Sequence, residues 1–563
     1  MSRAPRHQMD LAHRQAIETG RTRLVLMVTL AMLAFLAIGV RLVDLMVLRE
    51  GYEPRLADAN PPGAWQTDRA NILDRNGEIL ATSLRTASLY ADPKLVQNPK
   101  LAARRLARLL PGLRRNEAYA LLTSKRRFVW IRRHLTPRQQ YAINRLGIPG
   151  LYFQHEERRV YPHGHLAAHV VGFTGVDNRG LSGIEKSFDE ALRNGSGPLK
   201  LSLDVRVQHI LADEIAGAMQ RFRAIGGTGV VMDVTNGEVL GLVSMPDFNP
   251  NRPGAASPDA MFNRATLGIY EMGSTFKIFT VAMALESGTA TIESIYDASE
   301  PIRVARFRIH DYKPKNRWLS VPEILMYSSN IGAAKIAMEI GTTRQRSYLA
   351  KLGLLDQAHL ELPEIGSPLA PEPWREINLM TIAYGHGLAV SPLQLTSAVA
   401  TVVNGGIALP ATLLQQPETP PEGVRVFSTE TSERMRRLLH LVVDQGTGSH
   451  AVAKGYLVGG KTGTAEKDTA KGYARKALRS SFVGAFPMHD PRYAIFVMLD
   501  EPKGDKATFG YATGGWVAAP LVGRIVTRMA PLVGVAPIDE QAPAVKKRMF
   551  IEINDRGKRL ASF

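Results

Sequence analysis

The sequence predicts a multidomain α+β protein: one N-terminal transmembrane helix, an irregular arginine-rich zone, and a domain with an antiparallel five-stranded sheet flanked by helices. Three observations predict this class. The chain has 563 residues, too many for one ordinary core. An uncharged apolar run begins at residue 24. Strand-turn-strand patterns lie at both ends of residues 198–535, separated by a long, mostly helical stretch.

The apolar run at residues 24–40 contains no charge and nearly spans a bilayer at 1.5 Å per residue. Arginines dominate the segment before it (Arg3, Arg6, Arg14, Arg21 and Arg23, against Asp10 and Glu18). The positive-inside rule therefore predicts a cytoplasmic tail at 1–23, an anchor at 24–48 and an exported remainder. The alternative is a signal peptide cleaved near Gly39, but the run exceeds the usual signal core.

Composition and charge limit the kinds of partner that the protein is expected to bind. Basic residues outnumber acidic ones by 70 to 52, a net charge of +18 that suits a polyanionic partner. The basic stretch at 125–133 lacks a nucleic-acid-binding signature and is predicted to be exported. We therefore expect no nucleic acid there, but a solvated face or a protein-docking surface. The absence of cysteine excludes disulfides and thiolate metal sites.

Three histidines form a small cluster (His163, His165 and His169). His165 and His169 would share a helix face, as metal ligands often do, but no acidic third ligand is placed nearby. We interpret them as structural histidines in preference to a metal site.

The first zone begins with a hairpin around Asn76-Gly77, for which the dipeptide predicts a type I′ turn. A helix should follow from the cap Asn98 to residue 110, with an apolar face (Leu101, Leu106, Leu109 and Leu110). A capping box at residues 136–139 starts another helix, which ends near Gly147.

The second zone supplies the five predicted strands. Residues 230–240 form strand, Asn-Gly turn and strand, and residues 482–486 and 493–499 flank a turn at 489–491. Residues 457–460 are the fifth candidate. The sheet is therefore assembled from both ends of its domain.

Three short strings fit one catalytic machine for acyl transfer through a serine: Ser274-Thr275-Phe276-Lys277, Ser328-Ser329-Asn330 and Lys461-Thr462-Gly463-Thr464. Ser274 precedes a helical pattern, so its hydroxyl lies at the positive end of a helix dipole and its backbone N–H can bind an oxyanion. Lys277 reaches over the same face. It acts as a base only if burial and a second cation, for which Lys461 is the candidate, depress its pKa.

The other two strings supply proton transfer and substrate binding. The Ser328 hydroxyl can pass a proton between Lys277 and a leaving amine, and the Asn330 amide can hold Lys277 and a substrate carbonyl. Thr462 and Thr464 can bind a substrate carboxylate, and Gly463 lets a ligand backbone approach the strand. The N–H of Thr464 would complete the oxyanion hole with that of Ser274.

Each string alone has an ordinary structural explanation: a helix cap for the two serine strings and a protected edge strand for the third. Their joint occurrence in this order favours a serine acyltransferase. A Ser-His-Asp triad competes poorly, because the chain has no Gly-x-Ser-x-Gly elbow.

With these strings, the chain resembles the class B penicillin-binding proteins, the membrane-anchored peptidoglycan D,D-transpeptidases, and is most similar to their septal Gram-negative members. Further segments share the resemblance: residues 69–81, 159–162, 183–185, 245–251, 263–265, 384–387, 391–394 and 446–448. Two positions depart from the usual pattern. Met272 stands where the family often has proline, and Ala70 where it often has glycine.

The resemblance implies an elongated α+β pedestal of the dimerisation type at 49–197, a transpeptidase domain at 198–535 and a C-terminal tail at 536–563. It implies that Ser274 attacks the penultimate D-Ala of a stem peptide and that β-lactams acylate the same serine. It also implies division partners, among them a membrane glycosyltransferase of the shape-and-division family, a location in the inner membrane at the septum, and no metal or organic cofactor.

Other functions remain as alternatives. An elongation-type transpeptidase of the same class differs in its place in the cell. A β-lactamase or carboxypeptidase needs a deacylation base, which we do not identify in the sequence. A β-lactam sensor needs an output domain, and an inactive division scaffold should lack one of the reactive groups.

Overall fold

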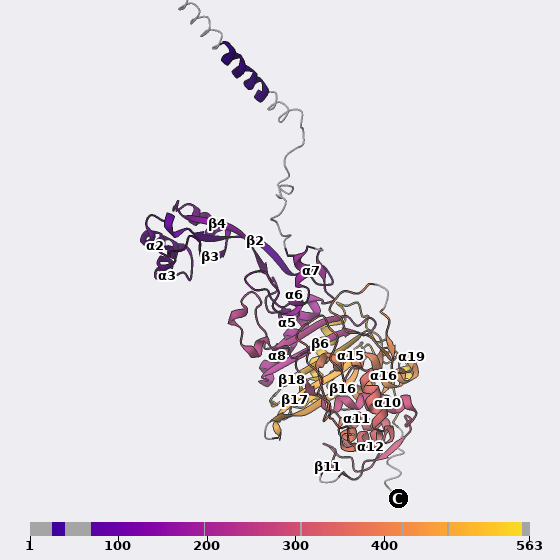
Figure 1. Cartoon of the computed structure of the whole chain (residues 1–563). Coiled ribbons are helices and arrows are strands. Elements are labelled where there is room, and N and C mark those ends of the chain that lie inside the picture. Colours follow the sequence, from indigo (N-terminus) through magenta and orange to yellow (C-terminus); the bar gives the residue numbers. More distant parts are fainter. Residues whose placement is uncertain are drawn as a thin grey trace, which may run out of the picture. The chain divides into compact units, whose positions relative to one another are not determined.

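The computed structural model describes residues 25–39, 69–195, 197–304, 307–417, 421–469 and 472–553 (Figure 1). Contacts divide the chain into two compact units, residues 1–66 and 67–563. In the first unit residues 25–39 are helical and their apolar side chains are exposed. Within the described ranges, no helix has both the length and the apolar character needed to cross a bilayer. The predicted tail at 1–23 lies outside the described residues, as does much of the predicted anchor at 24–48.

The second unit begins with a five-stranded sheet of order β3-β2-β1-β5, in which β4 also pairs with β2. The long strand β2 pairs antiparallel with β1, β3 and β4, whereas β5 pairs parallel with β1. Strands β1 and β2 form the hairpin predicted around Asn76-Gly77. The bounds are β1 Ile72–Leu73, β2 Ile79–Ala91, β3 Val129–Leu135, β4 Leu151–Val160 and β5 Leu199–Lys200.

The turn of this hairpin differs from the predicted type I′. Only Gly77 has a positive φ (89°), whereas type I′ requires positive values at both Asn76 and Gly77. The Asp74 carboxylate accepts bonds from the N–H groups of Asn76 and Glu78, and the Asp74 N–H donates to the Glu78 carbonyl. The aspartate therefore closes a longer loop that ends on a left-handed glycine. The second Asn-Gly turn departs in the same way, with a positive φ at Gly237 alone.

Helices cover one face of this first sheet. Asn98 caps α2 and Thr136 forms the predicted capping box of α4. Ala103 and Leu106 of α2 pack with Leu89 of β2 in one buried cluster. Leu101, which we assigned to the apolar face, is 40% exposed instead. The bounds are η2 Pro93–Leu95, α2 Pro99–Leu109, α3 Arg115–Leu122 and α4 Pro137–Asn144.

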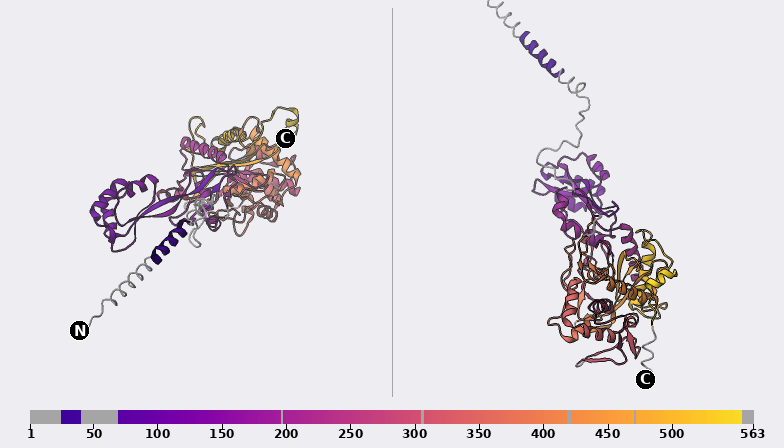
Figure 2. Two further views of the ribbon diagram at one scale, coloured as in Figure 1. Left: turned by 90° about the horizontal axis from the view of Figure 1, so that it is seen from above. Right: turned by 90° about the vertical axis from the view of Figure 1, so that its right-hand side faces the viewer.

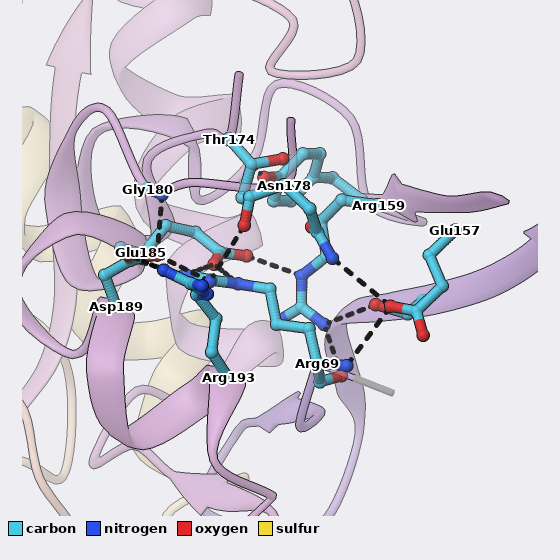
Figure 3. A network of polar contacts seen from close by, with 11 residues as sticks. Arg69, Glu157, Arg159, Thr174, Asn178, Gly180, Glu185, Asp189 and Arg193 are labelled. Carbon is cyan, nitrogen blue, oxygen red and sulfur yellow. Dashed lines mark hydrogen bonds and ion pairs between the residues drawn. The ribbon is translucent and has the colours of Figure 1, made fainter. Parts of the chain in front are cut away.

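A buried charge network joins three segments at the base of this sheet (Figure 3). Arg69, 2% exposed, donates to the Glu185 carboxylate at 2.6 Å and to Asp189 at 2.6 Å. Arg159, at the end of β4, donates to the other Glu185 oxygen at 2.6 Å and to the Arg69 carbonyl at 3.2 Å. One carboxylate thus binds two arginines, so the chain entering β1 is fixed to β4 and α6. The short helices here are α5 Ala168–Val171, α6 Gly183–Ser187 and α7 Asp189–Arg193.

The second sheet confirms the predicted five antiparallel strands, in the order β16-β17-β18-β6-β7. Figure 1 shows β6, from early in the domain, beside the yellow strands from its end, and Figure 2 gives two further views of the same ribbon. The third catalytic string lies inside β16, which starts two residues later than our candidate at 457–460. The bounds are β6 Gly226–Asp233, β7 Val239–Met245, β16 Gly459–Thr469, β17 Gly472–Phe486 and β18 Tyr493–Asp500.

Helices cover both faces of this sheet. Helices α8 and α18 share one core with Val231, Ile495 and Val497. Helices α10, α11, α15 and α16 share the other core with Val230, Phe496 and Met498. The bounds are α8 Val205–Phe222, α10 Lys277–Ser287, α11 Val321–Tyr327, α12 Asn330–Ile340, α13 Thr342–Lys351, α14 Glu376–Ile382, α15 Pro392–Val403, α16 Thr429–Asp444 and α18 Ala519–Met529.

Short elements complete the second unit. They are η3 Pro253–Ala255, α9 Pro258–Met261, β8 Tyr270–Glu271, η4 Gly273–Phe276, β9 Ile295–Asp297, β10 Ile302–Val304, β11 Phe307–Ile309, β12 Trp318–Ser320, β13 Ala389–Val390, β14 Ile407–Ala408, β15 Val424–Arg425, η5 Ser449–Ala451, α17 Gly514–Val517 and α19 Pro543–Met549.

Candidate active site

Ser274 and Lys277 occupy one tight helical turn. Ser274 lies in the 3-10 turn η4, and Lys277 is the first residue of α10. Side chains three residues apart eclipse one another in a 3-10 turn, so both groups point the same way. The Lys277 Nζ lies 2.8 Å from the Ser274 Oγ.

Two carbonyl oxygens also contact the Lys277 amine. It donates to the backbone carbonyl of Ser328 at 3.0 Å and to the Asn330 Oδ1 at 2.6 Å. Both atoms can only accept hydrogen bonds. A neutral amine has two hydrogens and one lone pair, so these two acceptors leave the lone pair for the Ser274 hydroxyl. The arrangement can therefore take the proton of that hydroxyl.

The second string connects two helices. Ser328 ends α11 in the left-handed region (φ 63°), and Ser329 is the N-cap of α12. The Ser328 Oγ lies 3.2 Å from the Lys277 amine and 3.0 Å from the Lys461 amine. One hydroxyl thus bridges both lysines, as a proton carrier requires.

The third string approaches the nucleophile from β16. Lys461 is fully buried, and the Thr462 hydroxyl donates to the Thr447 hydroxyl at 3.1 Å. The Thr464 hydroxyl accepts from the Gly514 N–H at 3.0 Å. The structure thus brings every predicted site residue of the three strings to one place.

The structure gives a reason for glycine at position 463 in addition to the predicted one. A Cβ added there would lie 2.7 Å from the Met272 carbonyl and 2.4 Å from the Ser481 hydroxyl. The missing side chain therefore makes room for the turn that carries Ser274, and the predicted approach of a ligand backbone stays a prediction. Gly273 is the reciprocal position, since its Cβ would lie 2.7 Å from the Thr464 carbonyl. These two glycines let Ser274 and Thr464, the predicted oxyanion donors, approach each other.

Electrostatics favour a neutral Lys277. Burial lowers its pKa well below the ordinary value, the charge of Lys461 lowers it further, and Asp311 opposes the shift. Burial also lowers the pKa of Lys461 to about 7. Taking an ammonium out of water disfavours its charged form, and a neighbouring cation adds to that effect.

Sequence reasoning missed Asp311. Its buried carboxylate accepts from the Ser329 hydroxyl at 2.7 Å and from the N–H groups of Asn330 and Ile331 at 2.5 and 3.0 Å. The Asn330 Nδ2 donates to the His310 carbonyl at 3.0 Å, which turns Oδ1 toward Lys277. No local pattern could reveal Asp311, because it follows the short β11 in an irregular segment.

The three histidines of the predicted cluster each contact a different residue. His163 lies 3.3 Å from Glu78, His165 contacts Asp247 at 3.1 Å, and His169 bonds the Ala260 carbonyl at 2.8 Å. Burial lowers the pKa of His169 to about 4. Over the residues that the structure describes, no group of three or more His, Cys, Asp or Glu side chains is arranged to hold a metal ion.

Comparison with known families gives two matches. The family described as "Penicillin binding protein transpeptidase domain" matches residues 227–527. The family described as "Penicillin-binding Protein dimerisation domain" matches residues 65–213. The first match contains all three strings, and the second contains the first sheet and its charge network.

Curated relatives are similar over most of the chain. A probable peptidoglycan D,D-transpeptidase FtsI of Caulobacter vibrioides is 38% identical over 94% of this chain and 92% of the relative. The peptidoglycan D,D-transpeptidase FtsI of Escherichia coli K12 is 31% identical over 84% of each chain. Among solved structures, penicillin-binding protein 3 of Mycobacterium tuberculosis complexed with ampicillin superposes with a TM-score of 0.69. It is 23% identical, over 87% of this chain and 99% of that one.

Proposed function

This chain belongs to the penicillin-binding protein transpeptidase family, and from that premise we propose that it is a septal peptidoglycan D,D-transpeptidase with Ser274 as its nucleophile. The observation that carries the proposal is the set of contacts around Lys277. Two carbonyl acceptors and the hydroxyls of Ser274 and Ser328 surround an amine whose pKa is depressed. An acyl-serine reaction requires this geometry of nucleophile and base.

The geometry assigns a role to each group. Lys277 takes the proton as the Ser274 Oγ attacks the penultimate D-Ala carbonyl of a stem peptide, and the N–H groups of Ser274 and Thr464 stabilise the oxyanion. The C–N bond then breaks, and the terminal D-Ala leaves with a proton delivered through Ser328. Lys461, Thr462 and Thr464 bind its carboxylate.

The second half of the reaction forms the crosslink. An amine of a neighbouring stem peptide attacks the acyl-serine carbonyl and loses its proton to Lys277. The C–O bond to Ser274 then breaks, and the Ser274 Oγ takes that proton back. A β-lactam enters by the first half alone: its amide opens onto Ser274, and the product stays attached. No step requires a metal or an organic cofactor.

Covalent capture with a labelled penicillin tests the assignment. We expect one adduct on the native protein, none on Ser274→Ala, and a normal adduct on Ser428→Ala, which removes a serine that caps α16 outside the site. An adduct that persists on folded Ser274→Ala, or the lack of any adduct on the folded native protein, overturns the proposal.

The septal role rests on relatives named for cell division, such as the Caulobacter FtsI. An elongation-type transpeptidase and a non-catalytic division scaffold are the competing functions. Mid-cell fluorescence of a tagged protein, with division blocked when Ser274→Ala replaces the native copy, is the expected result. Side-wall fluorescence would favour the elongation role, and normal division with Ser274→Ala would favour the scaffold.

We also propose the predicted organisation and location. Residues 24–48 anchor the chain once in the bacterial inner membrane, with the tail 1–23 in the cytoplasm. Residues 49–197 form the pedestal, 198–535 the catalytic domain and 536–563 a tail on the periplasmic side. Support comes from the uncharged apolar run and the arginines that precede it.

An exposed aromatic surface supports the proposed division partners. Trp130, Tyr90 and Tyr152 lie in register across β3, β2 and β4, and Phe128 stacks on Tyr90 at 4.6 Å. Phe128 and Tyr152 are 45% and 42% exposed. Aromatic residues and arginine are enriched in protein interfaces, and Arg133 lies over the Trp130 ring at 5.3 Å. Among the proposed partners we include a membrane glycosyltransferase of the shape-and-division family.

A further inference from the structure

The turn that carries Ser274 is held by a segment more than a hundred residues away. Strand β8, just before the turn, pairs with β13, so that Glu271 lies opposite Ala389. The Gly273 N–H donates to the Gly385 carbonyl at 3.1 Å. We call residues 384–387, which precede β13, the brace segment.

Glu271 forms a second link to the same segment. Its Oε1 accepts from the Gly387 N–H at 2.7 Å, and its Oε2 lies 3.2 Å from the His386 Nδ1. Its side chain is 19% exposed and that of His386 is 32% exposed, so water screens the pair only partly. One carboxylate thereby fixes the backbone and a side chain of the brace segment to the strand before the nucleophile.

The fit between brace and turn leaves no room for another atom. A Cβ at Gly385 would lie 1.8 Å from the Gly273 carbonyl oxygen, and Gly385 itself has a φ of 88°. On its other side, Gly273 lies so close to β16 that an added Cβ would be 2.7 Å from the Thr464 carbonyl oxygen. Gly273 is therefore enclosed between the brace segment and β16, and Ser274 follows it directly.

The residue between Glu271 and Gly273 does not restrain the turn covalently. Met272 has a φ of −97° and a ψ of 2°, and its side chain is buried. A methionine does not fix φ covalently as a proline ring does. The carboxylate of Glu271 and the carbonyl of Gly385 therefore supply restraint that this position does not provide.

We propose that Glu271 is a positioning residue: through Gly387 and His386 it sets the brace segment against Gly273, and so aims the Ser274 N–H and hydroxyl at the reacting carbonyl. The inference rests on the proposed role of Ser274 as the nucleophile. Displacing the brace slows acylation because the N–H of Ser274 and that of Thr464 no longer converge on one oxyanion. Misplacing reacting groups by about 1 Å can cost about 100-fold in rate.

A pair of glycine substitutions separates misalignment from backbone strain. Gly385→Ala adds a Cβ that collides with the Gly273 carbonyl, whereas Gly353→Ala meets nothing within 4 Å at a similar positive φ of 70°. Both variants bear the strain of a left-handed alanine. We expect the acylation rate constant for a labelled penicillin to fall by about 100-fold in Gly385→Ala and to stay within about twofold of native in Gly353→Ala.

A series at Glu271 tests the carboxylate and keeps the inference falsifiable if Gly385→Ala does not fold. Glu271→Ala should lower the acylation rate constant by about tenfold or more while the dissociation constant of the pre-covalent complex changes little. Glu271→Gln should restore most of the rate, because its amide can accept from Gly387 and donate to His386. Glu361→Ala is the matched control, since Glu361 likewise binds a backbone N–H (Leu413) and a side chain (Thr412), but in another part of the domain.

The outcomes are distinct. Loss in Glu271→Ala, rescue in Glu271→Gln and native rates in Glu361→Ala support the inference. Native acylation rates in folded Glu271→Ala overturn it, as does an equal loss in Glu361→Ala, which would indicate general destabilisation. If the native protein forms no adduct on Ser274, the proposed function itself fails.

Discussion

At the residue scale, the site depends on keeping one amine uncharged. Lys277 is fully buried, and its hydrogen-bond partners are carbonyls and hydroxyls. The titratable groups that face it are Lys461 from β16, Asp311 after β11 and Tyr384 after α14, whose ring centroid is 6.0 Å from the amine. Lys461 makes a second positive charge costly, which supports the proposed roles of Lys277 as the base and Lys461 as the remaining cation.

These shifts predict the pH dependence of acylation. A lysine with a lowered pKa becomes a base far below pH 10.5, so the rate rises with pH through the lowered pKa of Lys277. Above the pKa of Lys461, about 7, the charge that binds the substrate carboxylate is lost and the rate falls. We expect a bell-shaped profile of the second-order acylation rate constant. A single rise centred near pH 10.5 would contradict this account.

Replacing Lys461 by methionine tests the cause of the fall in acylation rate at high pH. The expected Lys461→Met profile has no fall above neutral pH, and its rising limb moves to higher pH because a cation that lowered the pKa of Lys277 is gone. The overall rate drops, since the carboxylate loses its partner. The same titration with a penicillin reporter provides the measurement, and an unchanged rising limb would contradict the coupling.

At the element scale, local sequence chemistry predicted the first hairpin, helices α2 and α4 and the five strands of the second sheet. Helix caps such as Asn98 and Thr136 depend only on neighbouring residues, so the sequence predicts them. The same holds for the alternating pattern of the late strands. The type I′ turn predicted at Asn76-Gly77 was wrong because the Asp74 carboxylate bonds two backbone N–H groups, which Asn-Gly alone does not reveal. Asp311 and the brace segment act across long sequence separations, so no local pattern indicates them.

The charge network around Glu185 makes an element-scale prediction. Arg69→Met removes one of the two arginines that bind the buried Glu185 carboxylate. Removing one partner of a buried ion pair lowers the free energy of unfolding by about 3–5 kcal/mol. Arg434→Met removes an exposed helix pair with Glu430 and should change stability by at most about 0.5 kcal/mol. Chemical denaturation measures both. Equal effects would show that the network does not stabilise the junction.

At the scale of the whole molecule, the fate of residues 1–23 decides between an anchor and a signal peptide. An uncleaved anchor retains an N-terminal epitope tag on the mature protein, which then stays with membranes after alkaline extraction. Cleavage near Gly39 would release a protein without the tag. The length of the apolar run favours retention.

The order of strands in the second sheet has a consequence for how the protein is made. Ser274 and Lys277 are synthesised well before β16, β17 and β18, and β6, which pairs with β7 on one side, obtains its second neighbour only when β18 is made. A nascent polypeptide that has not yet reached residue 459 already contains the nucleophile, but it lacks Lys461 and the Thr464 backbone donor. A chain interrupted before residue 459 therefore lacks groups that the proposed reaction needs, and the complete site can form only after β16 has been synthesised.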